Sequence, residues 1–439
     1  METHLADFIR DTPAGREAEA ILRKCVHCGF CNATCPTYQL LGDELDGPRG
    51  RIYLMKQVLE TGAATARTRL HLDRCLTCRA CETTCPSGVQ YSRLLDVGRE
   101  LVVTRASRRV VDRLARALLR NFLTRRRLFA AALRLGQSLR PLLPAGLKSR
   151  VPGRCEPGPW PAPRHARRMV VLAGCVQPAL LPGVNAATAR VLDRIGISLV
   201  EAQGRNGAGC CGALRFHLDD VDGARADARR NIDAWWPLLQ AGYEGIVMTA
   251  SGCGVQVRDY AHLLAGDPRY AAKAARVALA TRDVAELLAA EQPALLTRLR
   301  ESVAAAGATG ATRAAEAGPR RIAFHAPCTL QHGQSIRGTV EELLMAAGFE
   351  LTAVADAHLC CGSAGTYSVL QPGISARLRD ERLAALSAGE PALIASANVG
   401  CIAHLQSGSA TPVRHWIELI DDRLRGAQAS AASTRAPRR

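Results

Sequence analysis

Two short cysteine runs stand out in this sequence of 439 residues. Residues 25–36 read CVHCGFCNATCP and residues 75–86 read CLTCRACETTCP, so both runs have the spacing C-x2-C-x2-C-x3-C-P. Three thiolates at this spacing can hold one face of a 4Fe–4S cluster. The fourth cysteine, which precedes a proline, ligates a second cluster in such runs. Two runs in one chain are therefore expected to complete each other's clusters.

This spacing predicts two 4Fe–4S clusters with crossed ligands. The ligands of the first cluster are expected to be Cys25, Cys28, Cys31 and Cys85. The ligands of the second cluster are expected to be Cys75, Cys78, Cys81 and Cys35. Structural zinc would favour cysteine pairs over two quartets that end in Cys-Pro. Disulfides are disfavoured because the N-terminal segment METHLADFIRDTPAGREAEAIL lacks the apolar stretch of a secretory signal.

The segment between the two runs must bring them together. In PRGRIYLMKQVLETG, Ile52, Met55 and Leu59 recur at helical spacing, which predicts an amphipathic helix. Residues 1–100 are therefore expected to form a helical domain that positions both runs. Because only 4% of the residues are aromatic while 48% are hydrophobic, the cores must consist mainly of Ala, Leu and Val.

Residues 101–140 are predicted to form a basic helical segment. Between residues 105 and 140 there are eleven Arg and one acid, Asp112. The apolar residues on one helical stripe are Val111, Leu114, Leu118 and Phe122. With a net charge of +17 for the whole chain, such a segment could contact an anionic membrane surface, an acidic partner subunit or nucleic acid. A solvated basic face is the remaining alternative.

The rest of the chain contains an internal duplication. Residues 141–168 are rich in Pro and Gly and are predicted to be a linker, whereas residues 426–439 are expected to form a disordered tail. Between them, one copy begins RRMVVLAGC and the other RRIAFHAPC, and both continue through a helix pattern, a strand, a double cysteine and another strand. The copies are assigned to 169–290 and 319–425, with a connecting segment at 291–318.

Strands that alternate with helices predict two α/β units with mainly parallel sheets, related by pseudo-twofold symmetry. The cysteines of both units follow strand ends, where α/β folds keep their sites. Eight cysteines at matched positions are candidates for a further metal site or for redox thiols: Cys175, Cys210, Cys211, Cys253, Cys328, Cys360, Cys361 and Cys401. An unusual iron–sulfur cluster, zinc, a redox-active thiol pair and buried cysteines without a function all remain open.

No catalytic residue is predicted. The hexapeptide GAGCCG (207–212) matches the pattern G-x-G-x-x-G, but it follows the second strand of its copy rather than the first. The equivalent AHLCCG lacks the two earlier glycines, so nucleotide binding is not predicted. Nothing in the sequence offers a hydride acceptor. Oxidation of an organic substrate is therefore expected to occur on another chain.

The runs and the text between them, above all TYQLLGDELDGPRGRIYL, resemble the iron–sulfur subunit of glycolate oxidase (glycolate dehydrogenase). The double-cysteine repeats resemble the CCG domains shared with heterodisulfide reductase and anaerobic glycerol-3-phosphate dehydrogenase subunits. The resemblance implies a ferredoxin-like helical domain followed by a duplicated CCG domain. It also implies an oxidoreductase complex whose flavoprotein subunits oxidise glycolate to glyoxylate. This chain, inactive on glycolate alone, would then pass electrons toward a quinone-type acceptor.

Three alternatives follow from the same features. They are an iron–sulfur subunit of another flavin dehydrogenase acting on glycerol-3-phosphate or lactate, a subunit of a heterodisulfide-reductase-like complex, and a nucleic-acid-processing protein with structural clusters. Nucleic acid is not the expected partner, because paired clusters with crossed ligands are spaced for electron passage.

The repeats depart from the full CCG pattern, which ends in C-x-x-C. Ala250 and Gln256 occupy the two partner positions of Cys253, and Asn398 and His404 occupy those of Cys401. Each copy is thus one thiolate short, and His404 is a candidate substitute ligand.

The longest charge-free stretch, residues 169–189, contains two prolines and is predicted to be strand, turn and helix rather than a membrane span. The expected location is the cytoplasm, with peripheral attachment at the inner face of the cell membrane.

Overall fold

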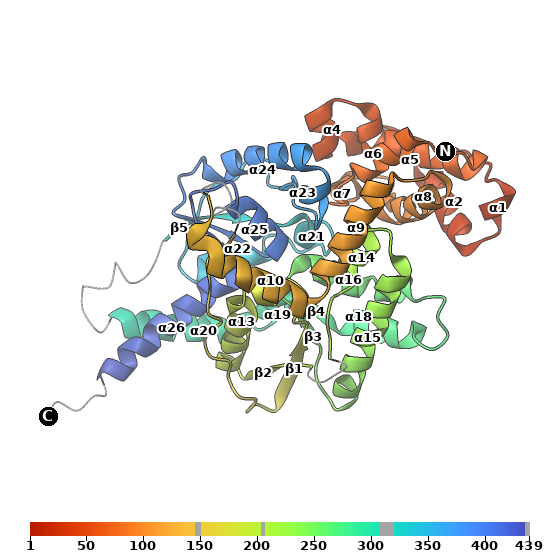
Figure 1. Ribbon diagram of the computed structural model, residues 1–439. Coiled ribbons are helices and arrows are strands. Elements are labelled where there is room, and N and C mark those ends of the chain that lie inside the picture. The colour runs from red at the N-terminus through yellow and green to blue at the C-terminus, as the bar shows by residue number, and fades with distance from the viewer. Residues whose placement is uncertain (145–150, 203–206, 308–319, 435–439) are drawn as a thin grey trace.

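The computed structural model describes residues 1–144, 151–202, 207–307 and 320–434. The N-terminal part is a helical unit at one end of the molecule (Figure 1). Its elements are α1 (Asp7–Arg10), α2 (Pro13–Lys24), α3 (Phe30–Ala33), α4 (Pro36–Leu41), η1 (Glu44–Asp46), α5 (Pro48–Thr61), α6 (Ala66–Asp73), α7 (Ala80–Thr84) and α8 (Tyr91–Arg105).

Local sequence signals start these helices. The Thr12 side chain accepts a hydrogen bond from the backbone of α2, while Pro36 and Pro48 occupy the first positions of α4 and α5. The predicted stripe of α5 is buried, with Met55 and Leu59 both 0% exposed in the core that α5 forms with α2 and α8. This packing places the ends of the two cysteine runs next to each other.

The rest of the fold consists of two parallel four-stranded sheets, which confirms the predicted α/β duplication. The first sheet has the order β2-β1-β3-β4, and the second the corresponding order β6-β5-β7-β8. The strands are β1 (Arg167–Val171), β2 (Ile197–Glu201), β3 (Ile246–Met248), β4 (Thr281–Asp283), β5 (Arg321–His325), β6 (Glu350–Leu351), β7 (Leu393–Ser396) and β8 (Val413–His415). All the pairings are parallel, so equivalent strands of the two repeats end at equivalent edges.

Helices cover both sheets (Figure 1). The first repeat contains α12 (Gln177–Leu180), α13 (Gly183–Arg194), α14 (Ala213–His217), α15 (Val221–Gln240), α16 (Ser251–Arg258), α17 (Tyr260–Leu263), α18 (Ala271–Ala280), α19 (Val284–Ala290) and α20 (Gln292–Gly307). The second contains α21 (Cys328–Gln331), α22 (Thr339–Ala346), α23 (Tyr367–Leu370), α24 (Pro372–Ser387), α25 (Val399–Gln406) and α26 (Trp416–Thr434).

The two repeats share one hydrophobic core. Val171 of β1, Phe324 of β5 and Trp416 of α26 belong to the same buried cluster. A buried hydrogen bond of 2.9 Å joins His415 Nε2 to the carbonyl oxygen of Thr249 across the repeats. We therefore regard the repeats as one packed body rather than two independent domains.

The basic helices α9 (Val110–Leu123) and α10 (Arg126–Leu139), followed by η2 (Arg140–Leu142), run from the N-terminal unit across the repeats (Figure 1). Their orientation differs from that of an ordinary amphipathic helix, because the predicted apolar stripe faces outward. Val111, Leu114 and Leu118 are 78%, 65% and 71% exposed, respectively. Phe122 is half-buried and packs edge-to-face against Phe129 of α10, with ring centroids 5.7 Å apart.

Ion pairs explain this orientation. Arg108 Nη1 lies 2.5 Å from Asp73 Oδ2, and Arg108 Nη2 lies 2.9 Å from Asp219 Oδ2. Arg116 is buried against the same two carboxylates at 3.4 and 3.6 Å. Part of the basic face is therefore turned inward to neutralise acids of the N-terminal unit and the first repeat.

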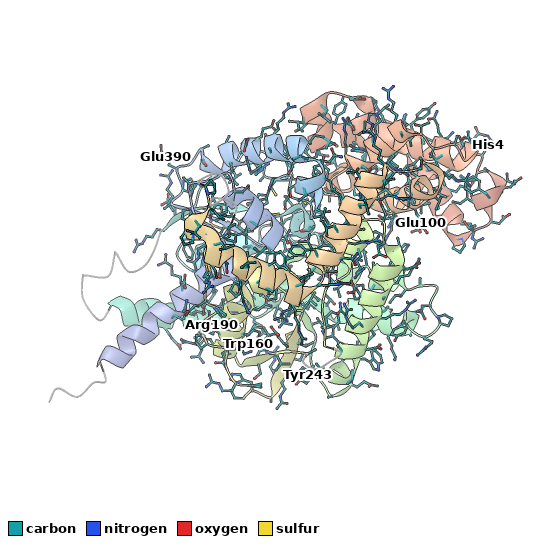
Figure 2. All side chains as sticks on the ribbon, viewed as in Figure 1. His4, Glu100, Trp160, Arg190, Tyr243 and Glu390 are labelled. Carbon is teal, nitrogen blue, oxygen red and sulfur yellow. The ribbon has the colours of Figure 1, made fainter. Side chains whose placement is uncertain are left out.

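The linker passes along the edge of the first sheet. Trp160 Nε1 donates to the carbonyl oxygen of Leu199 at 3.0 Å, and Arg190 Nη1 donates to that of Pro159 at 2.8 Å. Trp160 and Arg190 are accordingly neighbours at this surface (Figure 2). Residues 145–150 of the predicted linker lie outside the described residues.

The C-terminal segment differs from the expectation. Helix α26 continues to Thr434, so part of the tail predicted to be disordered is helical, as its alanine-rich sequence permits. Residues 435–439 lie outside the described residues. Within the described ranges, none of the helices has both the length and the apolar character needed to cross a membrane.

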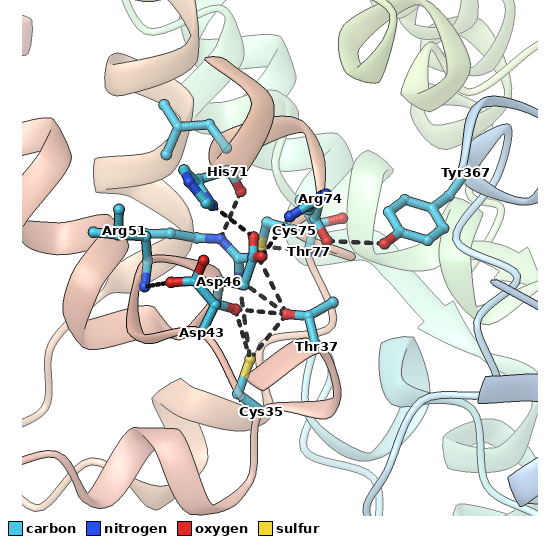
Figure 3. A network of polar contacts seen from close by, with 12 residues as sticks. Cys35, Thr37, Asp43, Asp46, Arg51, His71, Arg74, Cys75, Thr77 and Tyr367 are labelled. Carbon is cyan, nitrogen blue, oxygen red and sulfur yellow. Dashed lines mark hydrogen bonds and ion pairs between the residues drawn. The ribbon is translucent and has the colours of Figure 1, made fainter. Parts of the chain in front are cut away.

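A buried ion network around Asp46 joins the loop after the first cysteine run to α6 (Figure 3). Asp46 is 0% exposed, and its Oδ1 lies 3.0 Å from His71 Nδ1 and 3.5 Å from Arg51 Nη2. Its Oδ2 accepts a hydrogen bond of 2.7 Å from Arg74 Nη1. Its backbone oxygen accepts one of 2.8 Å from Thr37 Oγ1, two residues after Cys35.

Arg51 extends the network toward the sulfur atoms. Its Nε donates to the carbonyl oxygen of His71 at 2.7 Å, and its Nη1 donates to Thr37 Oγ1 at 3.1 Å and lies 3.9 Å from Cys35 Sγ. Burial by itself would lower the pKa of Arg51, but surrounding anionic groups, Cys75 foremost, hold that pKa above its ordinary value. Arg51 therefore brings a permanent positive charge beside Cys35.

We expect Asp46→Asn to lower the free energy of unfolding of the helical unit by about 3–5 kcal/mol, because it leaves Arg51 buried without a full counter-charge. Thermal unfolding of the anaerobically purified chain, followed by circular dichroism, measures the effect. Glu44→Gln is the matched control, since Glu44 is 41% exposed in its pair with Arg49 and such a pair contributes at most about 1 kcal/mol. Equal, small changes in both variants would contradict a supporting role for the Asp46 network.

Candidate metal centres

The first of two sulfur-lined cavities lies between the two cysteine runs. Its wall includes the predicted first ligand set, Cys25, Cys28, Cys31 and Cys85. The remaining wall is largely apolar and includes Val26, Pro48, Ile52 and Val89, and Arg49 and His27 also line the cavity. The structure thus brings the fourth cysteine of the second run to the first three cysteines of the first run.

The second cavity is built from the other set of cysteines in the same two runs. Its wall includes the predicted second ligand set, Cys35, Cys75, Cys78 and Cys81. Arg51, Tyr91 and Leu95 also line it, so the charge beside Cys35 reaches this cavity. Cys81 lies in the walls of both cavities, which places the two sulfur sets directly next to each other.

Matched backbone turns shape the two runs. His27 and Gly29 have φ values of 60° and 89°, and Thr77 and Arg79, at the same positions of the second run, have 54° and 61°. Only Gly29 is a glycine, so three side-chain-bearing residues adopt the left-handed conformation at a cost of about 1–2 kcal/mol each. Left-handed residues at equivalent positions of both runs indicate that each loop turns its cysteine side chains toward a common bound group.

The sulfur atoms resist ionisation while they are crowded together. Burial, followed by the charge of Cys25, raises the pKa of Cys31 to about 11. Burial also raises the pKa values of Cys78 and Cys81 well above the ordinary range, with other cysteines adding to the shift. Thiolates at such positions require a nearby cation, which bound iron would supply. The donor sets therefore fit the two 4Fe–4S clusters predicted from the spacing.

The two cavities differ in their surroundings. At the first cavity Cys28 is exposed, and the neighbouring Val26 and Phe30 are 69% and 63% exposed. At the second cavity, Cys78 packs with Leu76 against Cys328 and Cys360 of the second repeat. One cavity thus lies close to the protein surface, whereas the other lies where the helical unit meets the second repeat.

Polar contacts fix the helical unit on the repeats. Asp259 accepts from Arg79 Nη2 and Arg93 Nη2, each at 2.8 Å, and Thr83 Oγ1 lies 2.9 Å from His332 Nδ1. Tyr367 Oη donates to the carbonyl oxygen of Arg74 at 3.0 Å, which links α23 to the Asp46 network (Figure 3).

In the first repeat, the four candidate cysteines form a continuous set of thiols. Cys210 is the central thiol, because its interactions with Cys175 and Cys211 lower the pKa of Cys210 well below its ordinary value. The pKa of Cys211 is correspondingly raised by its bonds with Cys210 and Cys253. The structure thus brings all four of these cysteines together.

The second repeat arranges its four cysteines in the same way. Cys328 Sγ and Cys360 Sγ are 3.8 Å apart, and Cys361 contacts both Cys360 and Cys401. Cys401 Sγ also accepts a hydrogen bond of 3.5 Å from Asn398 Nδ2. Asn398 occupies one position of the missing fifth cysteine and therefore serves the thiol set as a donor.

Among the described residues, His325 rather than the candidate His404 is grouped with these thiols. His404 points to Ser375, with Nε2 lying 3.1 Å from Ser375 Oγ, whereas His325 joins Cys361 and Cys401 in a buried group. His325 precedes Cys328 by three residues at the end of β5, in the stretch RRIAFHAPC. Comparison of this stretch with RRMVVLAGC would have revealed His325 as a polar residue at the position where the first repeat has Leu172.

Family profiles match most of the regions described above. The profile described as "4Fe-4S dicluster domain" matches residues 21–89, which include all eight cysteines of the two cavities. The profile described as "Cysteine-rich domain" matches twice, at residues 169–258 and 322–406. These matches confirm the prediction of 4Fe–4S clusters and of duplicated cysteine-rich domains.

Curated relatives extend over nearly the whole chain. The chain is 50% identical to the "Glycolate oxidase iron-sulfur subunit" of Escherichia coli (strain K12) over 425 residues, or 97% of this chain and 99% of that protein. It is 28% identical to the "Probable glycolate oxidase iron-sulfur subunit" of Bacillus subtilis (strain 168), with 90% of both chains covered. A "Lactate utilization protein A" from Bacillus velezensis is 28% identical over 57% of this chain and 97% of its own length.

The first of these similarities is decisive, because half of the residues are identical over almost the full length of both chains. The predicted resemblance is confirmed: the chain belongs to the family of glycolate oxidase iron–sulfur subunits.

Proposed function

We propose that this chain is the electron-carrying iron–sulfur subunit of a complex that oxidises glycolate to glyoxylate. The observation that carries the proposal is the pair of adjacent sulfur-lined cavities in a chain that matches a glycolate oxidase iron–sulfur subunit over 97% of its length. In this complex a flavoprotein subunit reacts with glycolate, and a quinone-type molecule is the final acceptor.

The crossed cysteine sets are the proposed cluster ligands. Cys25, Cys28, Cys31 and Cys85 would hold one 4Fe–4S cluster, and Cys75, Cys78, Cys81 and Cys35 the other. Such clusters accept and release one electron at a time. The left-handed turns keep the sulfur atoms around each cavity, and Arg51 offsets negative charge beside Cys35.

A partner with a flavin is required by the stoichiometry of the reaction. Oxidation of an alcohol to a carbonyl removes two electrons and two protons, whereas a flavin can take up a hydride and then release electrons singly. The exposed Val26 and Phe30 beside Cys28 offer an apolar rim at the accessible cavity. We place the flavoprotein contact at this rim, because it brings the partner closest to a sulfur set.

The crossed assignment is tested by comparing Cys85→Ser with two reference variants. Cys28→Ser should perturb the cluster of the first cavity, and Cys78→Ser that of the second. We expect the EPR spectrum and iron content of Cys85→Ser to match Cys28→Ser, because Cys85 lines the first cavity although Cys75 and Cys78 of the same run line the second. A match with Cys78→Ser would show that each run ligates only its own cluster.

The function is tested by reconstitution. The purified chain should not oxidise glycolate alone, whereas with its flavoprotein partners it should support electron transfer from glycolate to a quinone or dye, with glyoxylate as product. Cys28→Ser should reduce acceptor turnover by at least tenfold while substrate still reduces the flavin. Turnover of glycolate by the isolated chain would overturn the proposed division of labour. A complex active only on lactate would overturn the substrate.

The outward apolar stripe supports peripheral attachment to an anionic membrane surface. Val111, Leu114 and Leu118 of α9 are continued on α10 by Leu128 and Leu135, which are 46% and 62% exposed. Exposed arginines flank these residues: Arg109, Arg113, Arg125, Arg127 and Arg134. Apolar side chains bordered by cations are typical of helices that lie in the interface of an anionic bilayer. The apolar face, rather than the inward-turned arginines, is thus the proposed membrane contact.

The double variant Leu114→Ser/Leu118→Ser should reduce co-sedimentation of the full chain with phosphatidylglycerol vesicles by about tenfold or more, since burying each Leu contributes roughly 1.5–3 kcal/mol. Leu279→Ser is the matched control, because Leu279 of α18 is 70% exposed but lies away from the stripe. Equal sedimentation of the double variant and the control would overturn the membrane assignment. Unchanged sedimentation combined with loss of flavoprotein binding would assign the stripe to the partner subunit.

A further inference from the structure

A group of three potential metal ligands lies at the carboxyl end of β5 and β7. It consists of His325, Cys361 and Cys401, each of which offers one ligand atom within 4.8 Å of the others. The three residues are 3%, 1% and 4% exposed. They come from three separate segments, since His325 ends β5, Cys361 lies in the double cysteine and Cys401 is in α25.

The hydrogen bonds of His325 define which nitrogen is available. The Ser396 hydroxyl donates its only proton to the carbonyl oxygen of His325 at 3.0 Å. Ser396 Oγ must therefore accept from His325 Nδ1, which lies 3.0 Å away and carries the ring proton. The lone pair is then on Nε2, which is buried and has no hydrogen-bond partner among the described residues. A neutral imidazole held by its Nδ1 proton is the form in which histidine binds metals.

The neighbouring thiols complete a donor set. Cys360 precedes Cys361 and contacts it, so a third sulfur lies beside the group. Asn398 Nδ2 donates to Cys401 Sγ at 3.5 Å, so a polar contact holds this sulfur in its position. Two thiolates and one imidazole suit zinc(II) or iron(II), and a third thiol or a water supplies the fourth position of a tetrahedral site.

The first repeat provides an internal comparison. RRMVVLAGC aligns with RRIAFHAPC so that Leu172 corresponds to His325 and Cys175 to Cys328. Leu172 is 3% exposed and belongs to the apolar core of its repeat. The four thiols are present in both repeats, but among the described residues a buried imidazole is grouped with them in the second repeat alone.

We propose that the second repeat binds one zinc(II) or iron(II) ion through His325 Nε2 and the thiolates of Cys361 and Cys401. Binding would release the two thiol protons and satisfy the otherwise unpartnered imidazole nitrogen. Cys360 is the nearest candidate for the fourth ligand. This proposal does not depend on the glycolate reaction, because it rests on the donor set alone.

The proposed ion would lie next to the second sulfur-lined cavity of the helical unit. Cys360 packs against Cys78, which lines the second cavity of the helical unit. The ion would therefore lie directly behind the second sulfur set, at the junction of the helical unit and the second repeat.

Elemental analysis of the full chain, purified without oxygen, tests the proposal. The wild-type chain should contain one metal ion beyond the eight iron atoms of two 4Fe–4S clusters, either one zinc or a ninth iron. His325→Leu, which introduces the residue found in the first repeat, and Cys361→Ser should each lose about one ion while the EPR signals of both clusters persist. Cys211→Ser, at the position of Cys361 in the first repeat, is the matched control and should retain it.

Two sets of results would overturn the proposal. One is a wild-type chain with eight iron atoms and no further metal. The other is a His325→Leu chain that keeps its extra ion, or that loses four irons together, which would indicate an all-cysteine site or a third cluster. Circular dichroism identifies variants that fail to fold, and Cys401→Ser replaces any such variant in the comparison.

Discussion

The burial of the Asp46 carboxylate is the constraint on which the arrangement of the sulfur atoms depends. A carboxylate with no exposed surface must be surrounded by cations and donors, and here they come from both sides of the helical unit: Arg51 from α5, and His71 and Arg74 from α6 and its end. Because Thr37, two residues after Cys35, donates to the backbone oxygen of Asp46 and Arg74 directly precedes Cys75, the network around this carboxylate also brings the ends of the two cysteine runs together.

The same principle operates where the larger parts of the molecule meet. Asp259 of the first repeat is paired with Arg79 and Arg93 of the helical unit, and Asp73 and Asp219 share Arg108 and Arg116. Arginine is suited to these positions, since its planar group can contact two carboxylates at once. The high arginine content is thus partly structural, and the net charge of the chain alone is a poor guide to its partners.

The features that sequence reasoning predicted are those encoded locally. Short segments of sequence contain the cysteine spacing, the stripe of Ile52, Met55 and Leu59, and the alternation of strands and helices. The family profiles and the two parallel sheets confirm the domains that these patterns predict. The direction in which α9 faces was not predictable, because it depends on Asp73 and Asp219, which lie far from α9 in the sequence. The contact of His325 with Cys361 and Cys401 joins distant segments, but comparison of the two repeats could have singled out His325, because Leu172 stands at the equivalent position.

The apolar stripe on α9 and α10 has a consequence for how the subunit is handled by the cell. A chain that exposes Leu114, Leu118 and Leu135 carries a surface that other copies can bind, so its solubility is limited while that surface stays uncovered. Synthesis of the subunit without its neighbours should therefore favour inclusion bodies.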